Sequence, residues 1–377
     1  MDIKKFKSGT LRKNYKYQYF LPELINHSFY WTDTKINEQL EKASMKLGEL
    51  NSFARLVPNV DMFIRTHVLK EAVVSSRIEG TRTEMEEALL NKSDVKPEKR
   101  NDWQEVNNYV DAMNTAIQQL QKLPLSNRLL RNAHKKLMYQ VRGEYKNPGE
   151  FRKSQNWIGG ATITDAVFIP PAFTEVPDLM SDLEKFLHND DIAVPHLVKI
   201  AIAHYQFETI HPFLDGNGRV GRLLITLYLV SGGILNKPLL YLSDFFEKHK
   251  SLYYDNLTRV REKNDLRQWL LFFLVAVEKT ASKATLTLNQ ILVLKENIEK
   301  ERIIKLGKKI KNAQKFLDYL YSSPVIQVKD VEKKLNLSKQ ATYNLVDDFV
   351  NLDILKEITD FNRNRIFVFD EYVKMFK

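Results

Sequence analysis

Apolar residues recur every three to four positions along most of this chain, which is the spacing of one face of an α-helix. Glycine is sparse, at 13 of 377 residues, and strong helix formers are common. With 44% hydrophobic residues the chain can bury a sizeable core. The sequence therefore predicts a mainly α-helical protein.

The predicted helices are separated by recognisable stop and start signals. Gly80 is expected to end one helix, and Thr83 with Glu86 three residues later forms a capping box that would open the next. The charged segment 92–100, with Pro97, is expected to be a loop. The helices expected up to residue 285 are 31–56, 63–78, 83–90, 103–120, 129–140, 176–187, 194–208, 241–261 and 266–283.

Two regions depart from this pattern. Segment 142–171 holds most of the local glycine and proline, and its β-like runs predict a small β-hairpin at 157–171 within the helical protein. After about residue 300, three helices (308–321, 328–335 and 338–352, the last capped by Ser338) precede a turn at 362–364 and a β-run at 366–369. This order resembles a winged helix-turn-helix. The predicted organisation is an N-terminal helical region (1–125), a core (126–285), a helical linker (286–306) and a winged helix-turn-helix domain (307–377).

Composition excludes several classes of site. The chain has no cysteine, so disulfides, thiolate metal sites and a cysteine nucleophile are ruled out. No apolar run reaches transmembrane length and the first residues lack a signal core, which predicts a cytoplasmic protein without a membrane partner. The net charge of +10 suits nucleic acid or a nucleotide pocket equally well.

Chemistry is concentrated in His211-Pro-Phe-Leu-Asp-Gly-Asn-Gly-Arg-Val-Gly-Arg222. The glycines around Asn217 let backbone N–H groups converge on an anion at the start of the helix predicted after them. Arg219 and Arg222 lie three positions apart, so both can grip phosphates. Asp215 is a hard oxygen ligand suited to Mg²⁺, and His211 is a candidate general base. The segment therefore predicts a site for nucleotidyl or phosphoryl transfer.

The pattern His-Pro-Phe-x-Asp-Gly-Asn-Gly-Arg-x-x-Arg is similar, position for position, to the signature of the Fic (Fido) family. Most Fic proteins move AMP from ATP to a protein hydroxyl. The resemblance covers most of the first 280 residues and implies a Fic/Fido helical bundle with a β-hairpin flap and protein adenylyltransferase activity, with ATP as substrate and Mg²⁺ as cofactor. It implies that His211 deprotonates a Ser, Thr or Tyr hydroxyl, which attacks the α-phosphate and expels pyrophosphate.

The resemblance also assigns the remaining residues of the site. Asp215 would hold Mg²⁺, Asn217 and the adjacent backbone would bind the α-phosphate, and the two arginines would hold the β- and γ-phosphates. Tyr253 and Tyr254 match a tyrosine pair that lies against the base in some relatives, although such aromatics are equally often core residues. The residues expected to line ATP are Glu79, His211, Asp215, Gly216, Asn217, Gly218, Arg219, Val220, Gly221, Arg222, Tyr253 and Tyr254.

A second element of the resemblance lies upstream, in Ser75-Ser-Arg-Ile-Glu79-Gly80. Ser75 and Glu79 are four residues apart, so they share one face of the helix predicted at about 63–80. The segment resembles the inhibitory motif of the family, which implies that Glu79 reaches Arg222 and takes the place of the γ-phosphate. The alternative is an exposed glutamate at a helix end. In some relatives the same glutamate assists removal of AMP, so both directions of the reaction remain open.

The resemblance also identifies partners. Residues 157–171 look like the flap of the family, which pairs with the target backbone as an added strand; the alternative is an ordinary surface hairpin. The expected partner is a protein with an exposed hydroxyl side chain, and self-modification remains open, as does a homodimer. The motif does not favour a phosphocholine or UMP donor in place of ATP. It does not favour the phosphoryl-transferring branch of the family either, because Gly218 and Arg222 are both present.

The sequence leaves two alternatives of other classes. His204, Glu208 and His211 could bind a transition metal, but the His-Glu-x-x-His order of zinc hydrolases is missing. The second alternative is a DNA-binding regulator, but residues 301–377 hold 15 Lys and Arg against 11 Asp and Glu, which is only mildly basic, so target selection is favoured. The residues concerned are Lys339, Gln340, Thr342 and Asn344, with Asp347 and Asp348 beside them, and Arg363 and Arg365 at the wing.

Overall fold

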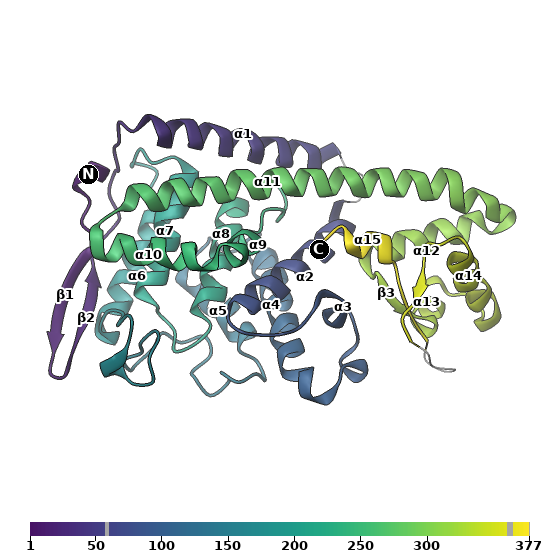
Figure 1. Cartoon of the computed structure of the whole chain (residues 1–377), viewed down its shortest axis with the longest axis horizontal. Helices are drawn as coiled ribbons and strands as arrows, with labels where there is room; N and C mark the ends of the chain where they lie inside the picture. Colours follow the sequence, from purple (N-terminus) through teal and green to yellow (C-terminus); the bar gives the residue numbers. More distant parts are fainter. Residues whose placement is uncertain (57–59, 360–364, 377) are drawn as a thin grey trace.

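The computed structural model describes residues 1–56, 60–359 and 365–376, and it is mainly helical, as predicted (Figure 1). The helices are α1 (Thr34–Leu56), α2 (Val60–Ile78), α3 (Met85–Ala88), α4 (Arg100–Gln119), α5 (Asn127–Leu137), α6 (Val176–His188), α7 (His196–Ile210), α8 (Asn217–Ser231), α9 (Ser243–Lys248), α10 (Lys250–Lys263), α11 (Leu266–Asn297), α12 (Ile310–Ser322), α13 (Val328–Leu335), α14 (Lys339–Asn351) and α15 (Asp370–Lys374). The strands are β1 (Gly9–Asn14), β2 (Tyr17–Pro22), β3 (Val325–Gln327), β4 (Lys356–Glu357) and β5 (Ile366–Val368).

The centre of the molecule is formed by α7 and α8. Almost every residue of both helices is buried, because apolar residues occur on every side of them and polar residues such as Glu208 and Arg219 are buried too. Helices α1 and α11 lie side by side along one edge, and α11 continues beyond the core (Figure 1). The predicted boundary between residues 285 and 286 falls inside α11, which ends at Asn297, and the chain bends at Gly307 before α12 begins.

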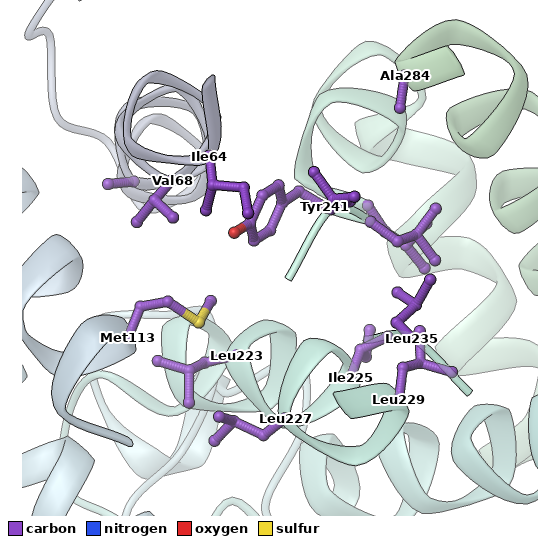
Figure 2. Close-up of a cluster of buried hydrophobic side chains, with 14 of the residues drawn as sticks. Ile64, Val68, Met113, Leu223, Ile225, Leu227, Leu229, Leu235, Tyr241 and Ala284 are labelled. Atoms are coloured by element: carbon purple, nitrogen blue, oxygen red, sulfur yellow. The ribbon is translucent and has the colours of Figure 1, made fainter. Parts of the chain in front are cut away.

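A buried apolar cluster holds α2 close to α8. Figure 2 shows Ile64 and Val68 of α2 opposite Leu223 of α8, with Met113 and Tyr241 between them. Burying a side chain of this size contributes about 1.5–3 kcal/mol each. The cluster therefore fixes α2 beside the helix that follows the His211 segment.

An antiparallel hairpin, β1–β2, precedes α1 and was not predicted, because β1 is largely polar and exposed. It lies against the predicted flap: the backbone N–H of Phe20 donates to the carbonyl of Ile169 at 2.9 Å. The flap itself turns back on itself, with Ile158 and Phe168 forming a single antiparallel bridge. The ring centroids of Phe20 and Phe168 are 6.0 Å apart, which adds an aromatic contact.

Some element boundaries differ from the prediction. Helix α3 begins at Met85, and its capping box is formed by Glu84 and Glu87, so the predicted box of Thr83 and Glu86 was wrong. Thr83 is buried instead. Segment 92–100 contains two 3₁₀ turns before α4 begins, and the single helix expected at 241–261 is divided into α9 and α10 at His249.

The C-terminal elements include the three predicted helices and the β-run at 366–369, but β3 between α12 and α13 and the final helix α15 were not predicted. Strands β3, β5 and β4 form an antiparallel sheet in that order. The Ser338 hydroxyl caps α14 by accepting from the N–H of Ala341 at 3.3 Å, as expected. The predicted turn at 362–364, including Arg363, lies outside the described residues.

These C-terminal elements pack against α2. The hydroxyl of Tyr372 donates to Oγ1 of Thr66 at 3.2 Å, and the rings of Phe376 and His67 meet edge to face with centroids 5.1 Å apart. Helix α12 also contacts α2. Helix α2 is therefore covered on one side by α8 and the core and on another by the C-terminal elements.

Within the described ranges, we find no helix with the length and apolar character needed to cross a bilayer.

Candidate active site

His211 caps the C-terminal end of α7. It adopts the left-handed conformation (φ 52°), and its N–H donates to the carbonyl of Phe207 at 2.9 Å. This conformation is uncommon for a residue with a side chain and persists where neighbouring contacts enforce it. The carbonyl of His211 accepts from Nε of Arg152 at 3.0 Å, which fixes the residue from the other side.

Arg152 organises the backbone around His211. Its side chain is buried and donates to four carbonyl groups, those of Ser154, Pro171, Ile210 and His211. Burial lowers the pKa of Arg152 to about 10, so the guanidinium remains charged at neutral pH. Because its partners are backbone atoms, no residue type in the sequence signalled this role.

The loop after His211 is held by its own side chains. Oδ1 of Asn217 accepts from the N–H of Phe213, and its Nδ2 donates to the carbonyl of Phe213, both at 2.8 Å. His134 stacks on Phe213 at 3.9 Å and hydrogen-bonds through Nε2 to the carbonyl of Asp215 at 3.0 Å. Gly216 takes the left-handed conformation (φ 76°) that brings the chain into α8. The side-chain amide of Asn217 is thus engaged within the loop, and His134 is a supporting residue that the sequence did not indicate.

The imidazole of His211 is neutral at physiological pH. Burial, assisted by the charges of Arg261 and Arg152, lowers its pKa to about 4. Its Nδ1 is buried without a hydrogen-bond partner in the described structure. A neutral imidazole can accept a proton, which is the state required of a general base.

Asp215 lies at the open side of the loop, with its side chain 35% exposed. Its Oδ2 is 2.9 Å from Nζ of Lys146, and its Oδ1 is 3.8 Å from Arg219. Burial alone would raise the pKa of Asp215, but Lys146 and Arg219 outweigh it, so the carboxyl is ionised. The described residues contain no cluster of three or more potential metal ligands. A single accessible carboxylate fits Mg²⁺, which proteins usually bind through one or two carboxylates together with substrate phosphates.

Arg219 is buried in an ion pair. Its Nη1 lies 3.0 Å from Oε2 of Glu105 on α4, and the two side chains are 5% and 6% exposed. Oε1 of Glu105 accepts from Nε of Arg142 at 2.9 Å. Sequence spacing suggested an arginine free to grip phosphate, whereas the structure gives it a fixed protein partner.

Arg222 is held by the end of α2. Its Nε donates to Oγ of Ser75 at 2.8 Å, and its Nη2 donates to the carbonyl of Ser75 at 2.9 Å and to Oε1 of Glu79 at 2.7 Å. Burial alone would raise the pKa of Glu79, but the adjacent Arg222 charge lowers it below the ordinary value, so the carboxylate is ionised. The three residues singled out in the sequence thus meet in space.

The Glu79 carboxylate lies over the first turn of α8. A methyl group placed on Gly218 would come within 2.2 Å of its Oε1. Gly80 follows with φ 104°, a conformation that favours glycine, and turns the chain away. Free N–H groups and the helix dipole make the start of α8 attractive to anions, and Glu79 is the anion that lies there.

The remaining predicted residues divide between the site and the core. Both ring nitrogens of His204 are engaged, one with the carbonyl of Gly221 and one with the hydroxyl of Tyr253, each at 2.9 Å. This leaves no free nitrogen for a metal. Tyr253 and Val220 are buried, whereas Tyr254 is 41% exposed and can meet a ligand.

A further carboxylate, that of Glu208, lies beside this site. Burial raises its pKa to about 7, and a methyl group on Gly221 would come within 2.1 Å of its Oε1. In the sequence, Glu208 stood out only as a possible metal ligand. Its packing explains why a glycine stands at position 221.

Two parts of the chain are similar to models of known protein families. Residues 37–118 match the model described as "Fic/DOC family N-terminal", and residues 124–229 match the model described as "Fic/DOC family". Protein adenylyltransferase Fic of Drosophila erecta is 30% identical over 162 residues, which are 43% of this chain and 30% of that protein. The Aedes aegypti protein of the same name is 35% identical over 133 residues, which are 35% of this chain and 24% of that protein. The match therefore spans less than a third of the length of these relatives.

A solved structure extends the likeness in fold. The crystal structure of a Fic family protein from Desulfovibrio desulfuricans G20 superposes with a TM-score of 0.56 at 21% identity, over 90% of this chain and 97% of that one. Two parts of the chain, residues 37–118 and 124–229, are therefore similar to the N-terminal region and the core of Fic/DOC proteins, and the fold is like that of a solved Fic family protein.

Proposed function

We propose that this chain is a protein adenylyltransferase that transfers AMP from ATP to a Ser, Thr or Tyr hydroxyl of a target protein or of itself. The observation that carries the proposal is a neutral, rigidly held His211 beside the anion-attracting start of α8 and Arg222. The family match and the curated adenylyltransferase relatives support it.

In the proposed reaction the target oxygen forms a bond to the α-phosphorus of ATP, and the bond from that phosphorus to the bridging oxygen of the β-phosphate breaks. His211 takes the hydroxyl proton, and pyrophosphate leaves. The backbone N–H groups at the start of α8 are suited to bind the α-phosphate oxygens, since they are fixed before the substrate arrives. Arg222, once free of Glu79, would hold the terminal phosphate.

Asp215 would hold Mg²⁺, which supplies positive charge to the phosphates when bound. For this, the carboxylate must exchange its contact with Lys146, whose side chain is 52% exposed and can move into solvent. Arg219 on the other side keeps the carboxylate ionised and oriented.

In this proposal the adenylyltransferase activity of the resting protein is suppressed. Glu79 engages the Nη2 atom of Arg222 that a γ-phosphate would require, so ATP would be held in an unproductive position. The same carboxylate could position a water molecule for removal of AMP, which keeps deAMPylation as the alternative direction.

We propose that the target docks along the flap (157–171). Phe20 of β2 already hydrogen-bonds to Ile169 on one edge of the flap. An added target strand would therefore pair beside Trp157, whose side chain is 40% exposed, rather than beside Ile169.

The test uses ATP labelled at the α- or the γ-phosphate, incubated with Mg²⁺ and the Glu79→Gly variant. Label retained on protein from the α-position only, together with a mass increase of one AMP, is expected. His211→Ala in the same background should abolish it. Label from the γ-position, or no label from either, would refute the proposal.

For residues 307–377 we propose a winged helix-turn-helix domain that selects protein targets. Arg365 of the wing is paired with Glu357 at 2.7 Å and stacks over Phe367, so its charge is not free for phosphates. A DNA-binding regulator with the Fic core as nucleotide sensor is the alternative. A gel shift whose affinity falls steeply with salt would favour that alternative.

A further inference from the structure

A line of alternating charges joins α4 to the first turn of α8. Arg142 contacts Glu105 at 2.9 Å, Glu105 contacts Arg219 at 3.0 Å, Arg219 contacts Asp215 at 3.8 Å, and Asp215 contacts Lys146 at 2.9 Å. The two outer cations are 62% and 52% exposed, whereas Glu105 and Arg219 are buried. The line therefore reaches from one exposed surface, through the interior, to the carboxylate at the mouth of the site.

Glu105 is the residue on which this line depends. Its two carboxylate oxygens are divided between two arginines, so neither oxygen is free to change partner without leaving an arginine charge unmatched. Helix α4 is itself anchored one turn later, where Nδ2 of Asn108 donates to the carbonyls of Leu137 and Tyr139 at 3.2 and 2.6 Å. The position of Glu105 is therefore set by the fold and does not depend on a bound ligand.

Arg219 depends on Glu105 in turn. A buried charge requires a close partner of opposite sign, and the other carboxylate near Arg219, that of Asp215, is 3.8 Å away and partly exposed. Nη2 of Arg219 otherwise contacts only Sδ of Met138, at 3.8 Å, and its Nε is buried without a partner in the described residues. Removing the Glu105 charge would leave the guanidinium free to turn fully toward Asp215.

We propose that Glu105 is a positioning residue for the proposed AMP transfer. It holds the Arg219 guanidinium at a fixed direction, so that Arg219 orients Asp215 without forming a close ion pair that would occupy the carboxylate. Arg219 and Arg222 then have different roles in the site. Arg222 changes partner between Glu79 and the nucleotide, whereas Arg219 keeps one protein partner throughout.

This inference rests on the proposed function and makes a distinct prediction. With Glu105→Gln, Arg219 should close on Asp215 and compete with Mg²⁺ for it. In the Glu79→Gly background, kcat should fall on the order of tenfold or more, as is usual when the partner of a site residue is lost. The Mg²⁺ concentration for half-maximal rate should rise, while the KM for ATP at saturating Mg²⁺ should change less than kcat.

The experiment is a double-mutant cycle of Glu105→Gln and Arg219→Gln, with rates of α-phosphate label incorporation and Mg²⁺ titrations for each variant. If Glu105 acts through Arg219, Glu105→Gln has no further effect in the Arg219→Gln background. Glu105→Asp should recover part of the lost rate. Glu49→Gln, which removes an exposed partner of Lys46 on α1, is the matched control and should behave like the parent.

Three outcomes separate the hypotheses. If the Glu79→Gly parent incorporates no α-phosphate label, the proposed function itself is refuted. An active parent with a parent-like Glu105→Gln rate and Mg²⁺ dependence overturns the positioning role. Additive losses in the cycle also overturn it, because they place the effect of Glu105 elsewhere. If Glu105→Gln does not fold, the cycle is made with Glu105→Asp and Arg219→Gln instead. Glu105→Asp should then shift the Mg²⁺ dependence of the rate only when Arg219 is present.

Discussion

The carboxylate of Glu79 lies 2.7 Å from the guanidinium of Arg222, although 143 residues separate them in the chain. The pair joins the end of α2 to the first turn of α8, and Ser75 adds two hydrogen bonds to the same arginine. The guanidinium is 2% exposed and the carboxylate 33%, so the arginine is fixed while the glutamate has access to solvent. Of the two partners, Glu79 is therefore the one that can leave.

Glu79→Gly should raise self-modification about tenfold or more, because Arg222 then becomes available to the nucleotide in every molecule. Glu79→Gln, which keeps the size and removes the charge, should give an intermediate rate. Incorporation of α-labelled AMP measures both variants. Equal rates for wild type and both variants would contradict an inhibitory role for the ion pair.

Gly218→Ala should separate relief of inhibition from activation. The new methyl group would come within 2.2 Å of Glu79 and 2.9 Å of Nη1 of Arg222, so it displaces the glutamate but also narrows the place where phosphate would bind. We expect weaker ATP binding by calorimetry and no gain in activity, unlike Glu79→Gly. Gly48→Ala is the matched control, since nothing lies within 4 Å of that position, and it should stabilise α1 by about 1 kcal/mol. Activity of Gly218→Ala equal to that of Glu79→Gly would argue against a shared space.

Arg152→Lys should reduce both stability and activity. A lysine keeps the charge but cannot reach four carbonyls with a planar fork, so buried acceptors around His211 lose their donors. Losing charge-assisted hydrogen bonds of this kind costs about 2–4 kcal/mol in unfolding free energy. Urea denaturation measures the loss, and Arg55→Lys, which alters an exposed hydrogen bond to Asn236, should change it by well under 1 kcal/mol. Equal stability of the two variants would show that Arg152 does not organise the backbone.

Stability should fall as the pH is lowered from 6.5 toward 4.5. Burial lowers the pKa of four histidines below the value near 6.5 that they have in the unfolded chain. At a pH between the unfolded and the folded pKa, only the unfolded state binds these protons, so acidification favours unfolding. The folded pKa values are about 3 for His67 and His204 and about 4 for His134 and His211.

Two buried glutamates oppose this trend. Burial raises the pKa of Glu71 and of Glu208 to about 7, so in the same window the folded state holds protons that the unfolded state has lost. The unfolded state therefore binds about two more protons, equivalent to at most about 3 kcal/mol per pH unit. Urea denaturation at pH 5.0 to 6.5 measures the slope. Glu71→Gln should steepen it by about 1.4 kcal/mol per pH unit, and an unchanged slope would mean that Glu71 is ionised in the folded state.

The sequence predicted those parts of the site that are contiguous or repeat with helical period. His211, Asp215 and Arg222 lie within one short segment, and the spacing of Ser75 and Glu79 placed them on one helix face. Glu105, by contrast, approaches Arg219 from α4, and its distance in the chain carries no local signal. Arg152 and His134 bind backbone carbonyls or amides, which any residue supplies, so no pairing of side-chain types reveals them.

The fold shows the same division. Amphipathic periodicity predicted most helices, because a helix that buries one face has apolar residues at a regular spacing in the sequence. The hairpin β1–β2 was missed because β1 is exposed on nearly all sides and shows no buried alternation. The start of α3 was misplaced because Thr83 is buried by tertiary contacts, which leaves Glu84 to cap the helix.

The hydrogen bond from Tyr372 to Thr66 places the C-terminal elements on the same helix that ends just before Glu79. Twelve residues of α2 lie between Thr66 and Glu79, which corresponds to about 20 Å along the helix axis. If α2 shifts when Glu79 releases Arg222, then nucleotide binding at Arg222 is coupled to partner binding at the C-terminal elements. Thermodynamic linkage requires this coupling free energy to be the same whichever of the two binds first. A partner that prefers one placement of α2 would then alter the affinity for ATP by the same factor by which ATP alters the affinity for that partner.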